Sequence, residues 1–374
     1  MIDRIREHLP ILRCPLSKQG LRGLEMWETD QLNSCIARRE CRHHDGTLVL
    51  ESLEIGVISL DGKFIYRVQE GILCMLPDHA ILQPNDFSKY EGETGIPTSR
   101  QDVQEFYDRI GWKKVNEKTY SDASQFEDLR AVSSDYISNC HRRVIRYIQR
   151  SGKYILDAAS GPVQYEEYLV YSKHYDFRIC VDISLLALKE ASRKIGKKGL
   201  FIQANITNLP LAKNCVDAIV SLHTIYHVPS EEQFIAFREL HRVLKPGATA
   251  AIVYSWGWRS SLMAFMLLPF AVLRWPLRLL RLLKALRTKP VGTTNEPTLY
   301  FYNHPRKRLE GELRKFCDFD LVVWRSVNIL FLRVYCHSWL FGKQLLSLIF
   351  SLEDTFPRFF GKVGAYPLIV MHKR

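Results

Sequence analysis

Two aspartates that each close a short apolar run are the residues best suited to chemistry in this sequence. Asp157 lies in "YILDAASGP", and Asp182 lies in "RICVDIS" about 25 residues later. In nucleotide-binding sheets an acid about 20 residues beyond the first loop accepts hydrogen bonds from ribose hydroxyls. The small residues Ala159, Ser160 and Gly161 let the backbone approach a ligand closely. The loop alone fits an empty strand-to-helix turn equally well, but with Asp182 it indicates an adenosine-type site.

The elements that must position these acids follow from the hydrophobic pattern. Short apolar runs alternate with helical patterns, which predicts a doubly wound, mostly parallel α/β sheet. The predicted strands are 154–159, 178–183, 200–203, 216–222 and 248–254, with later strands at 320–327 and 366–372. Helices are predicted near 165–171, 185–195 and 231–244, and we expect the first to begin near Val163. Such sheets bind ligands beyond the carboxyl ends of their strands, where both aspartates fall.

Four ordered segments carry a family resemblance. They are the Asp157 loop, "RICVDIS", "FIQANITNLPLAKNCVDAIVSLHTIYHVP" and "ELHRVLKPGATAAIVY". This set resembles the class I S-adenosylmethionine (SAM)-dependent methyltransferases of the small-molecule branch, well over residues 100–255 and loosely beyond. The resemblance implies a Rossmann-like seven-stranded sheet, SAM as the cofactor and methyl transfer as the activity.

The resemblance also implies which residues hold the cofactor. They are Tyr107, Asp157, Ala159, Ser160, Gly161, Asp182, Ile183, Asn205, Ile206, Ser221 and Leu222. The loop would line the methionine half of SAM, Asp182 the ribose, and Ile183 with Ile206 the adenine. Asn205 replaces the usual aspartate facing the adenine amino group, and Ser221 with Leu222 would lie near the sulfonium. The family loop often has three glycines, whereas here only Gly161 remains and Gln164 stands at the third small position.

The segment "HTIYH" supplies the candidate catalytic residues. His223 and His227 lie four residues apart, and imidazole can accept a hydroxyl proton near neutral pH. A structural role is the alternative for both, and no metal site is expected because a third ligand is lacking. Upstream, Tyr107, Trp112 and Tyr120 would close the pocket as a lid, or else pack between helices.

The N-terminal residues 1–80 form a β-rich unit by pattern. "LRCPLSKQGLRGL" and "GKFIYRVQEGILCMLP" resemble the zinc-ribbon activators of tRNA and ribosomal methyltransferases. Cys14 remains from the first ligand pair, but Ser17 replaces its partner and 59–62 holds no cysteine, so we expect the zinc ligands to be lost. Polar residues 81–101 are predicted as a linker, and 102–374 as the methyltransferase domain.

The stretch 256–296 interrupts this domain as an apolar and basic insert. Residues 262–273 are too short to span a bilayer, and Arg274, Arg278 and Arg281 share one stripe opposite a leucine-rich face. This pattern fits a helix in a membrane interface, which would give peripheral membrane contact through 262–287. It fits slightly better a buried helix that caps the substrate pocket or forms a homodimer interface. Both interpretations favour an apolar acceptor.

Composition limits the choice of partner and compartment. The 374 residues carry a net charge of +12, which favours anionic partners, and nine unpatterned cysteines indicate a reducing compartment. The charged start lacks a signal peptide, so we expect a cytoplasmic protein. The predicted activity is methyl transfer to a hydrophobic or lipid-like small molecule, with oxygen as the expected acceptor atom. The alternatives are an RNA methyltransferase, disfavoured by the absence of an Asn-Pro-Pro-Tyr motif, and a non-catalytic membrane-associated scaffold.

Overall fold

The computed structural model describes residues 2–82, 112, 120–121, 126–270, 272–273 and 299–374. Its centre is a sheet whose main strands are β7 (Gly152–Ala158), β8 (Tyr175–Asp182), β9 (Gly199–Gln203), β10 (Val216–Leu222), β11 (Leu244–Val253), β12 (Asp318–Arg325) and β13 (Tyr366–His372). These seven strands have the order β9–β8–β7–β10–β11–β13–β12. β13 is antiparallel to both neighbours, and the first five strands pair in parallel. The predicted doubly wound α/β fold is therefore confirmed.

Helices cover both faces of this sheet because side chains alternate along each strand. One face, with Ile155 and Val220, packs against α5 (Ser134–Arg143), α6 (Leu185–Ile195) and α12 (Gly342–Thr355). The other face, with Leu156 and Ile219, packs against α7 (Gln233–Val243) and α10 (Arg306–Leu313). Short 3₁₀ segments connect these elements: η5 (Val144–Tyr147), η7 (Gly196–Lys198) and η8 (Ile225–His227). Helices packed on both faces hold the sheet rigid. The strand ends, and the acids that they carry, therefore lie along one fixed edge.

The segment after β7 differs from the prediction. We expected a helix that begins near Val163, but the structure has a 3₁₀ helix, η6 (Glu166–Ser172), that begins three residues later. Val163 adopts a φ of 50°, which no right-handed helix can contain. The chain therefore completes its turn before the helical segment starts.

The N-terminal unit continues the main sheet. It comprises α1 (Ile2–His8), η1 (Leu9–Ile11), β1 (Leu21–Gly23), α2 (Met26–Ala37), β2 (Arg42–His43), β3 (Gly56–Ser59), β4 (Phe64–Gln69), β5 (Ile72–Cys74), η2 (Pro77–His79) and β6 (Ile81–Leu82). β5 pairs in parallel with β9, so the predicted β-rich unit joins the edge of the methyltransferase-like sheet. β6 also occupies the first two residues of the segment predicted as a linker, and 83–101 lie outside the described residues.

Two hydrophobic clusters hold the N-terminal unit. One is its own and contains Leu32, Ile36 and Ile65. The other is the core of the main sheet, to which this unit contributes Leu12 and Met75. Within the described ranges, no three His, Cys, Asp or Glu side chains are grouped to hold a metal ion. Whether this unit descends from a zinc ribbon thus stays a prediction.

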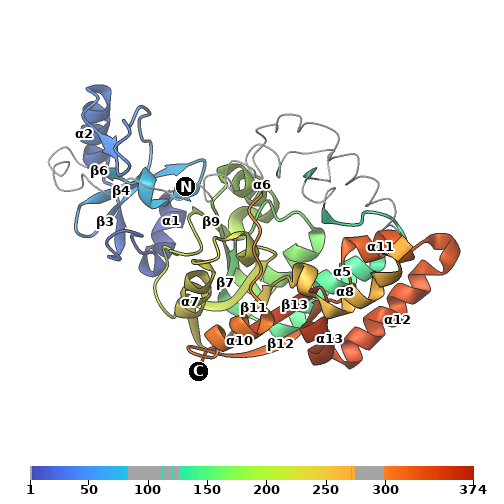
Figure 1. The fold of residues 1–374 in the computed structure, drawn as a ribbon. Helices are drawn as coiled ribbons and strands as arrows, with labels where there is room; N and C mark the ends of the chain where they lie inside the picture. Colours follow the sequence, from blue (N-terminus) through green and yellow to red (C-terminus); the bar gives the residue numbers. More distant parts are fainter. Residues whose placement is uncertain (1, 83–111, 113–119, 122–125, 271, 274–298) are drawn as a thin grey trace, which may run out of the picture.

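Helices dominate the C-terminal side. They are η9 (Gly257–Arg259), α8 (Ser261–Met266), α11 (Ile329–Tyr335), η10 (Ser338–Leu340), α12 and α13 (Pro357–Val363), and Figure 1 shows α8, α11, α12 and α13 close together. None of the helices in the described part of the chain is long and apolar enough to cross a membrane. The basic half of the predicted insert, 274–287, lies outside the described residues.

Candidate active site

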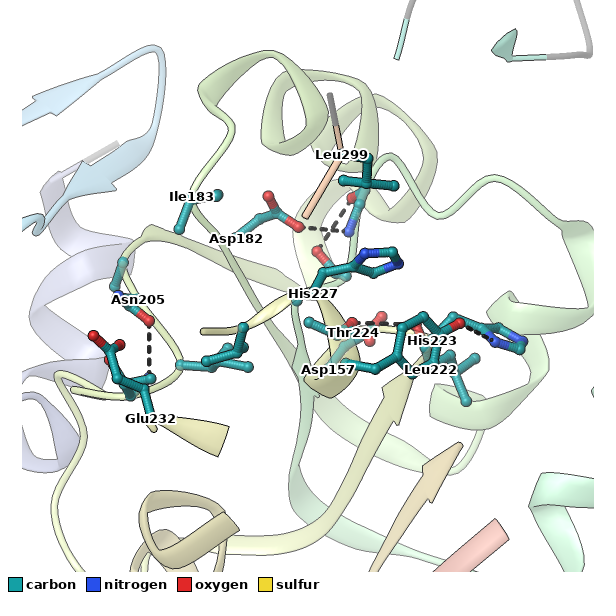
Figure 2. A pocket seen from close by; sticks show the side chains of 18 of the residues that line it. Asp157, Asp182, Ile183, Asn205, Leu222, His223, Thr224, His227, Glu232 and Leu299 are labelled. Atoms are coloured by element: carbon teal, nitrogen blue, oxygen red, sulfur yellow. Dashed lines mark hydrogen bonds between the residues drawn. The ribbon is translucent and has the colours of Figure 1, made fainter. Parts of the chain in front are cut away.

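A cavity of about 1310 Å³ lies at the carboxyl ends of the central strands. It contains the tips of β7, β8 and β10, and the strand order reverses between β7 and β10. Ligands of doubly wound sheets bind at this switch point. Figure 2 shows Asn205 and His223 on opposite sides of the pocket, with Asp182 and Asp157 between them. The structure thus brings Asp157, Asp182, Asn205 and His223 into one cavity.

In the loop after β7, every second residue has a left-handed backbone conformation. Ala159, Gly161 and Val163 have φ angles of 56°, 54° and 50°. This spacing makes Val163, and not Gln164 as expected, the third position that glycine would favour. Val163 is a β-branched residue in the left-handed region and is therefore strained. The loop keeps the conformation of a glycine-rich turn although only Gly161 lacks a side chain.

Asp182 connects this loop to the second strand. Its carboxylate accepts a hydrogen bond from Gly161 N at 2.8 Å and another from Ser184 N at 2.9 Å. An ionised carboxylate has about four acceptor positions, so these two bonds still allow it to accept ribose hydroxyls. Ser160 N is in turn held by Val181 O at 3.1 Å. The predicted ribose acid thereby also fixes the loop.

Asp157 makes a buried ion pair with a residue that we had not singled out. Arg178, from β8, donates through Nε to Asp157 Oδ2 at 3.1 Å and contacts the same oxygen through Nη2. Arg178 Nη1 also donates to Tyr168 O at 2.6 Å. A signal for this pair exists in the sequence, because Arg178 begins the otherwise apolar run "RICVD".

The predicted adenine residues line the cavity next to each other. Ile183, Asn205 and Ile206 all contribute to its wall, and Ile206 is almost fully buried. Asn205 Oδ1 accepts a hydrogen bond from Thr207 N at 2.9 Å, which closes a local turn. The amide oxygen expected to meet the adenine amino group is therefore already engaged within its own turn.

The remaining cofactor and lid candidates separate into three groups. Leu222 lines the cavity, but Ser221 is fully buried in β10 and is not part of the described wall. Trp112 also lines the cavity, and a Cβ atom added at Gly161 would lie 2.9 Å from its indole. Tyr120 is buried 6.2 Å from Trp112, ring to ring, without joining the wall. Tyr107 lies outside the described residues.

Both histidines reach the cavity, held by different partners. His223 Nδ1 lies 2.8 Å from Tyr226 Oη, and His227 Nδ1 lies 2.8 Å from Tyr300 O. Burial, together with the charge of Arg325, lowers the pKa of His223 well below its usual value. Burial also lowers the pKa of His227 to about 4. Both imidazoles are therefore neutral at pH 7 and act as hydrogen-bonding groups rather than cations.

A second buried ion pair lies in the wall beside His223. Arg325 ends β12, is 2% exposed, and places Nη1 2.5 Å from Glu127 Oε1. Its guanidinium lies 4.9 Å from the ring centre of Tyr366, whose ring also contacts His223 at 5.3 Å. We did not predict this pair, although Arg325 obeys the same strand-end rule as the aspartates. Glu127 has no comparable signal, because it lies in a segment without a clear periodic pattern.

The comparisons with known proteins agree with this geometry. Residues 156–252 match the family model described as "Methyltransferase domain". This segment is a methyltransferase domain. With the observed strand order, the match confirms the prediction of a class I, SAM-dependent methyltransferase domain within the chain. The small residues of the loop 159–161 and Asp182 at the tip of β8 fit SAM as the cofactor of this domain.

The similar proteins share only low sequence identity with this chain. The phthiotriol/phenolphthiotriol dimycocerosates methyltransferase 1 of Mycobacterium ulcerans is 26% identical over 110 residues, which cover 29% of this chain and 40% of that protein. Among solved structures, phosphoethanolamine N-methyltransferase 2 of Haemonchus contortus is 12% identical over 79% of this chain and 63% of its own, with a TM-score of 0.41. The [4+2]-cyclase SpnF is 16% identical over 74% of this chain and 97% of its own, with a TM-score of 0.40. Neither TM-score indicates more than a distant likeness.

Proposed function

We propose that the whole chain is a SAM-dependent methyltransferase that methylates a hydrophobic or lipid-like small molecule at oxygen. One observation carries this proposal: a single cavity joins the Gly161 loop and Asp182 to a wall of aromatic side chains. The Phe, Tyr and Trp members of that wall among the described residues are Trp112, Phe126, Tyr165, Tyr168, Tyr226, Phe301 and Tyr366. Apolar walls with few polar groups are typical of sites for small organic ligands.

Different residues of the chain would bind the cofactor and the acceptor. SAM, when bound, supplies an activated methyl group. Asp182 would accept the ribose hydroxyls, and the backbone of Ser160 and Gly161 would contact the methionine part. Transfer in line with the sulfonium depends mainly on orientation, which a rigid sheet edge provides.

His223 would meet the acceptor hydroxyl. In the tautomer in which Nδ1 carries the proton and donates it to Tyr226 Oη, Nε2 is the nitrogen that accepts a hydrogen bond from the acceptor hydroxyl. Because its pKa is depressed, His223 stays neutral and keeps that lone pair at physiological pH. It would orient the hydroxyl and take up its proton as the new C–O bond forms. An aliphatic or phenolic oxygen fits this arrangement better than an amine cation.

The relative from Mycobacterium ulcerans supports a lipid-like acceptor. It is named as a methyltransferase of phthiotriol and phenolphthiotriol dimycocerosates, and this chain spans 40% of its length. Among the described lining residues, the basic side chains of lysine and arginine are those of Lys18 and Arg325. Arg325 is paired with Glu127. So few cations favour an apolar acceptor over RNA, whose phosphates require clusters of them.

Mass spectrometry tests this proposal directly. Lipid and small-molecule extracts incubated with the protein and methyl-labelled SAM should yield a product that carries one labelled methyl group on oxygen. Calorimetry with SAM should show binding. Absence of SAM binding at high concentration would favour the scaffold, and salt-sensitive RNA methylation would favour the nucleic-acid alternative.

We also propose peripheral contact of the C-terminal helices with an anionic lipid surface. Phe265, Trp339 and Phe341 are each more than 70% exposed, and Tyr335 Oη joins α11 to α8 through Met266 O at 2.7 Å. Aromatic exposure combined with a net charge of +12 suits an interface of anionic headgroups. Trp339→Ser should reduce cosedimentation with phosphatidylglycerol vesicles, whereas Trp27→Ser, an exposed tryptophan on α2, should not. Equal sedimentation of both variants would contradict the proposal.

A further inference from the structure

The N-terminal unit reaches the cofactor cavity through strand pairing. β5 runs parallel to β9, with Cys74 opposite Gln203, and Met75 N extends the ladder by donating to Gln203 O at 2.8 Å. Parallel strands end at the same edge of a sheet. The residues that follow β5 therefore arrive at the edge where Asp182 and Asn205 lie.

Residues from this unit form part of the cavity wall. Leu76, Pro77, Asp78 and His79 line it beside the turn 204–208. Lys18 lines it as well and contacts Asn208 Oδ1 through Nζ. Asn208 Nδ2 donates in return to Pro15 O at 3.1 Å. The segment 15–18 of the N-terminal unit is thus bonded to the turn expected to hold adenine, and the segment 76–79 lines the same cavity.

The adenine amino group requires an acceptor at this end of the site. Asn205 Oδ1 already accepts from Thr207 N, which leaves it one lone pair for a second donor. Asp78 is half-buried in the wall, and its carboxylate makes no hydrogen bond or ion pair with the described residues. A carboxylate is an acceptor only, so it matches an exocyclic amino group but not a carbonyl.

We infer that the N-terminal unit closes the adenine end of the cofactor site, and that Asp78 accepts a hydrogen bond from the adenine amino group. This inference rests on the proposed function, because it assigns a further contact to the same cofactor. Asp78 is therefore a cofactor-binding residue that lies outside the methyltransferase domain itself. Because β5 is covalently part of the unit, SAM affinity depends on the folding of residues 2–82.

Binding of two ligands to the full-length protein tests the contact. The ligands are S-adenosylhomocysteine and S-inosylhomocysteine, in which a carbonyl oxygen replaces the amino group, and calorimetry gives both affinities. Asp78→Ala should weaken the binding of S-adenosylhomocysteine at least about 10-fold, since it removes a hydrogen bond to a charged group. The affinity of the Asp78→Ala protein for S-inosylhomocysteine should be unchanged or higher, because the repulsion between two hydrogen-bond acceptors is removed.

Matched variants separate this effect from misfolding. Asp78→Asn keeps an acceptor oxygen and should lose less affinity than Asp78→Ala. Asp61→Ala, in the turn between β3 and β4 and outside the cavity wall, should bind both ligands like the wild type. Affinity of Asp78→Ala within twofold of wild type, or equal losses for both ligands, would overturn the inference while the proposed function stands. Failure of the wild-type protein to bind SAM would instead overturn the proposed function.

Discussion

Arg178 holds the carboxylate of Asp157 from the neighbouring strand; both side chains are buried, and Asp157 also lines the cavity. The same guanidinium donates to Tyr168 O, so the strand, its tip and the η6 segment share one cation. A buried charge whose partner is removed remains uncompensated in a low-dielectric interior. This pair therefore helps to fix the first strand tip.

Arg178→Met should lower the free energy of unfolding by roughly 3–5 kcal/mol, because it leaves Asp157 buried and unpaired. Urea unfolding followed by circular dichroism measures this loss. Arg193→Met is the matched control, since Arg193 pairs with Glu190 but is 69% exposed. The control should cost no more than about 1 kcal/mol. Similar losses in both variants would show that the Asp157 pair has no special structural role.

Ala159→Gly should stabilise the protein by about 0.5–1 kcal/mol. Ala159 has a φ of 56°, where an alanine Cβ is strained and glycine is not. Relief of this strain exceeds the added entropy of the unfolded chain. Thermal unfolding measures the change, and Ala158→Gly, within β7, should destabilise instead. A less stable Ala159→Gly protein would contradict the strained-loop interpretation.

Asp182→Ala should reduce SAM affinity at least 100-fold, because it removes two acceptors for ribose hydroxyls and releases Gly161 N. Calorimetry gives the affinity directly. Asp176→Ala tests the opposite, exposed end of the same strand and should bind SAM normally. Unchanged affinity in Asp182→Ala would refute the assignment of the ribose site.

His223→Ala should slow turnover roughly 100-fold, in the range for loss of a proton acceptor. SAM affinity should stay close to wild type, because His223 is predicted to serve the acceptor side. Steady-state kinetics with the identified acceptor, alongside SAM calorimetry, separates the two effects. A parallel loss of SAM affinity would assign His223 to the cofactor site.

Acid should destabilise the protein through its buried histidines. The native pKa of His227 is about 4, whereas the unfolded chain titrates near the ordinary value of 6.5. Below pH 6.5 the unfolded state therefore binds a proton that the native state excludes, and stability falls by up to about 1.4 kcal/mol per pH unit per histidine. His227→Gln should flatten the dependence of unfolding free energy on pH between 6.5 and 4. An unchanged slope would indicate that His227 is protonated in the native protein.

Local patterns were sufficient to predict the sheet and its strand tips. The predicted strands 216–222 and 366–372 coincide with β10 and β13, and helix 185–195 coincides with α6. Buried parallel strands are short continuous apolar runs, and an amphipathic helix repeats every 3.6 residues, so both patterns can be recognised without knowing the fold. Because parallel strands end at one edge, Asp157, Asp182 and His223 could be placed together from their positions alone.

Contacts between distant segments required the tertiary structure. Glu127 and Arg325 meet across 198 residues, and Asp78 reaches the adenine side only because β5 adds to β9. Neither pairing leaves a periodic trace, since one is a single ion pair between distant segments and the other is a strand pairing through backbone bonds that most side chains permit. Backbone geometry also decided that Val163, rather than Gln164, takes the third left-handed position. The sequence by itself determined the sheet, its acids and the family of chemistry, whereas long-range pairing decided which other side chains complete the site.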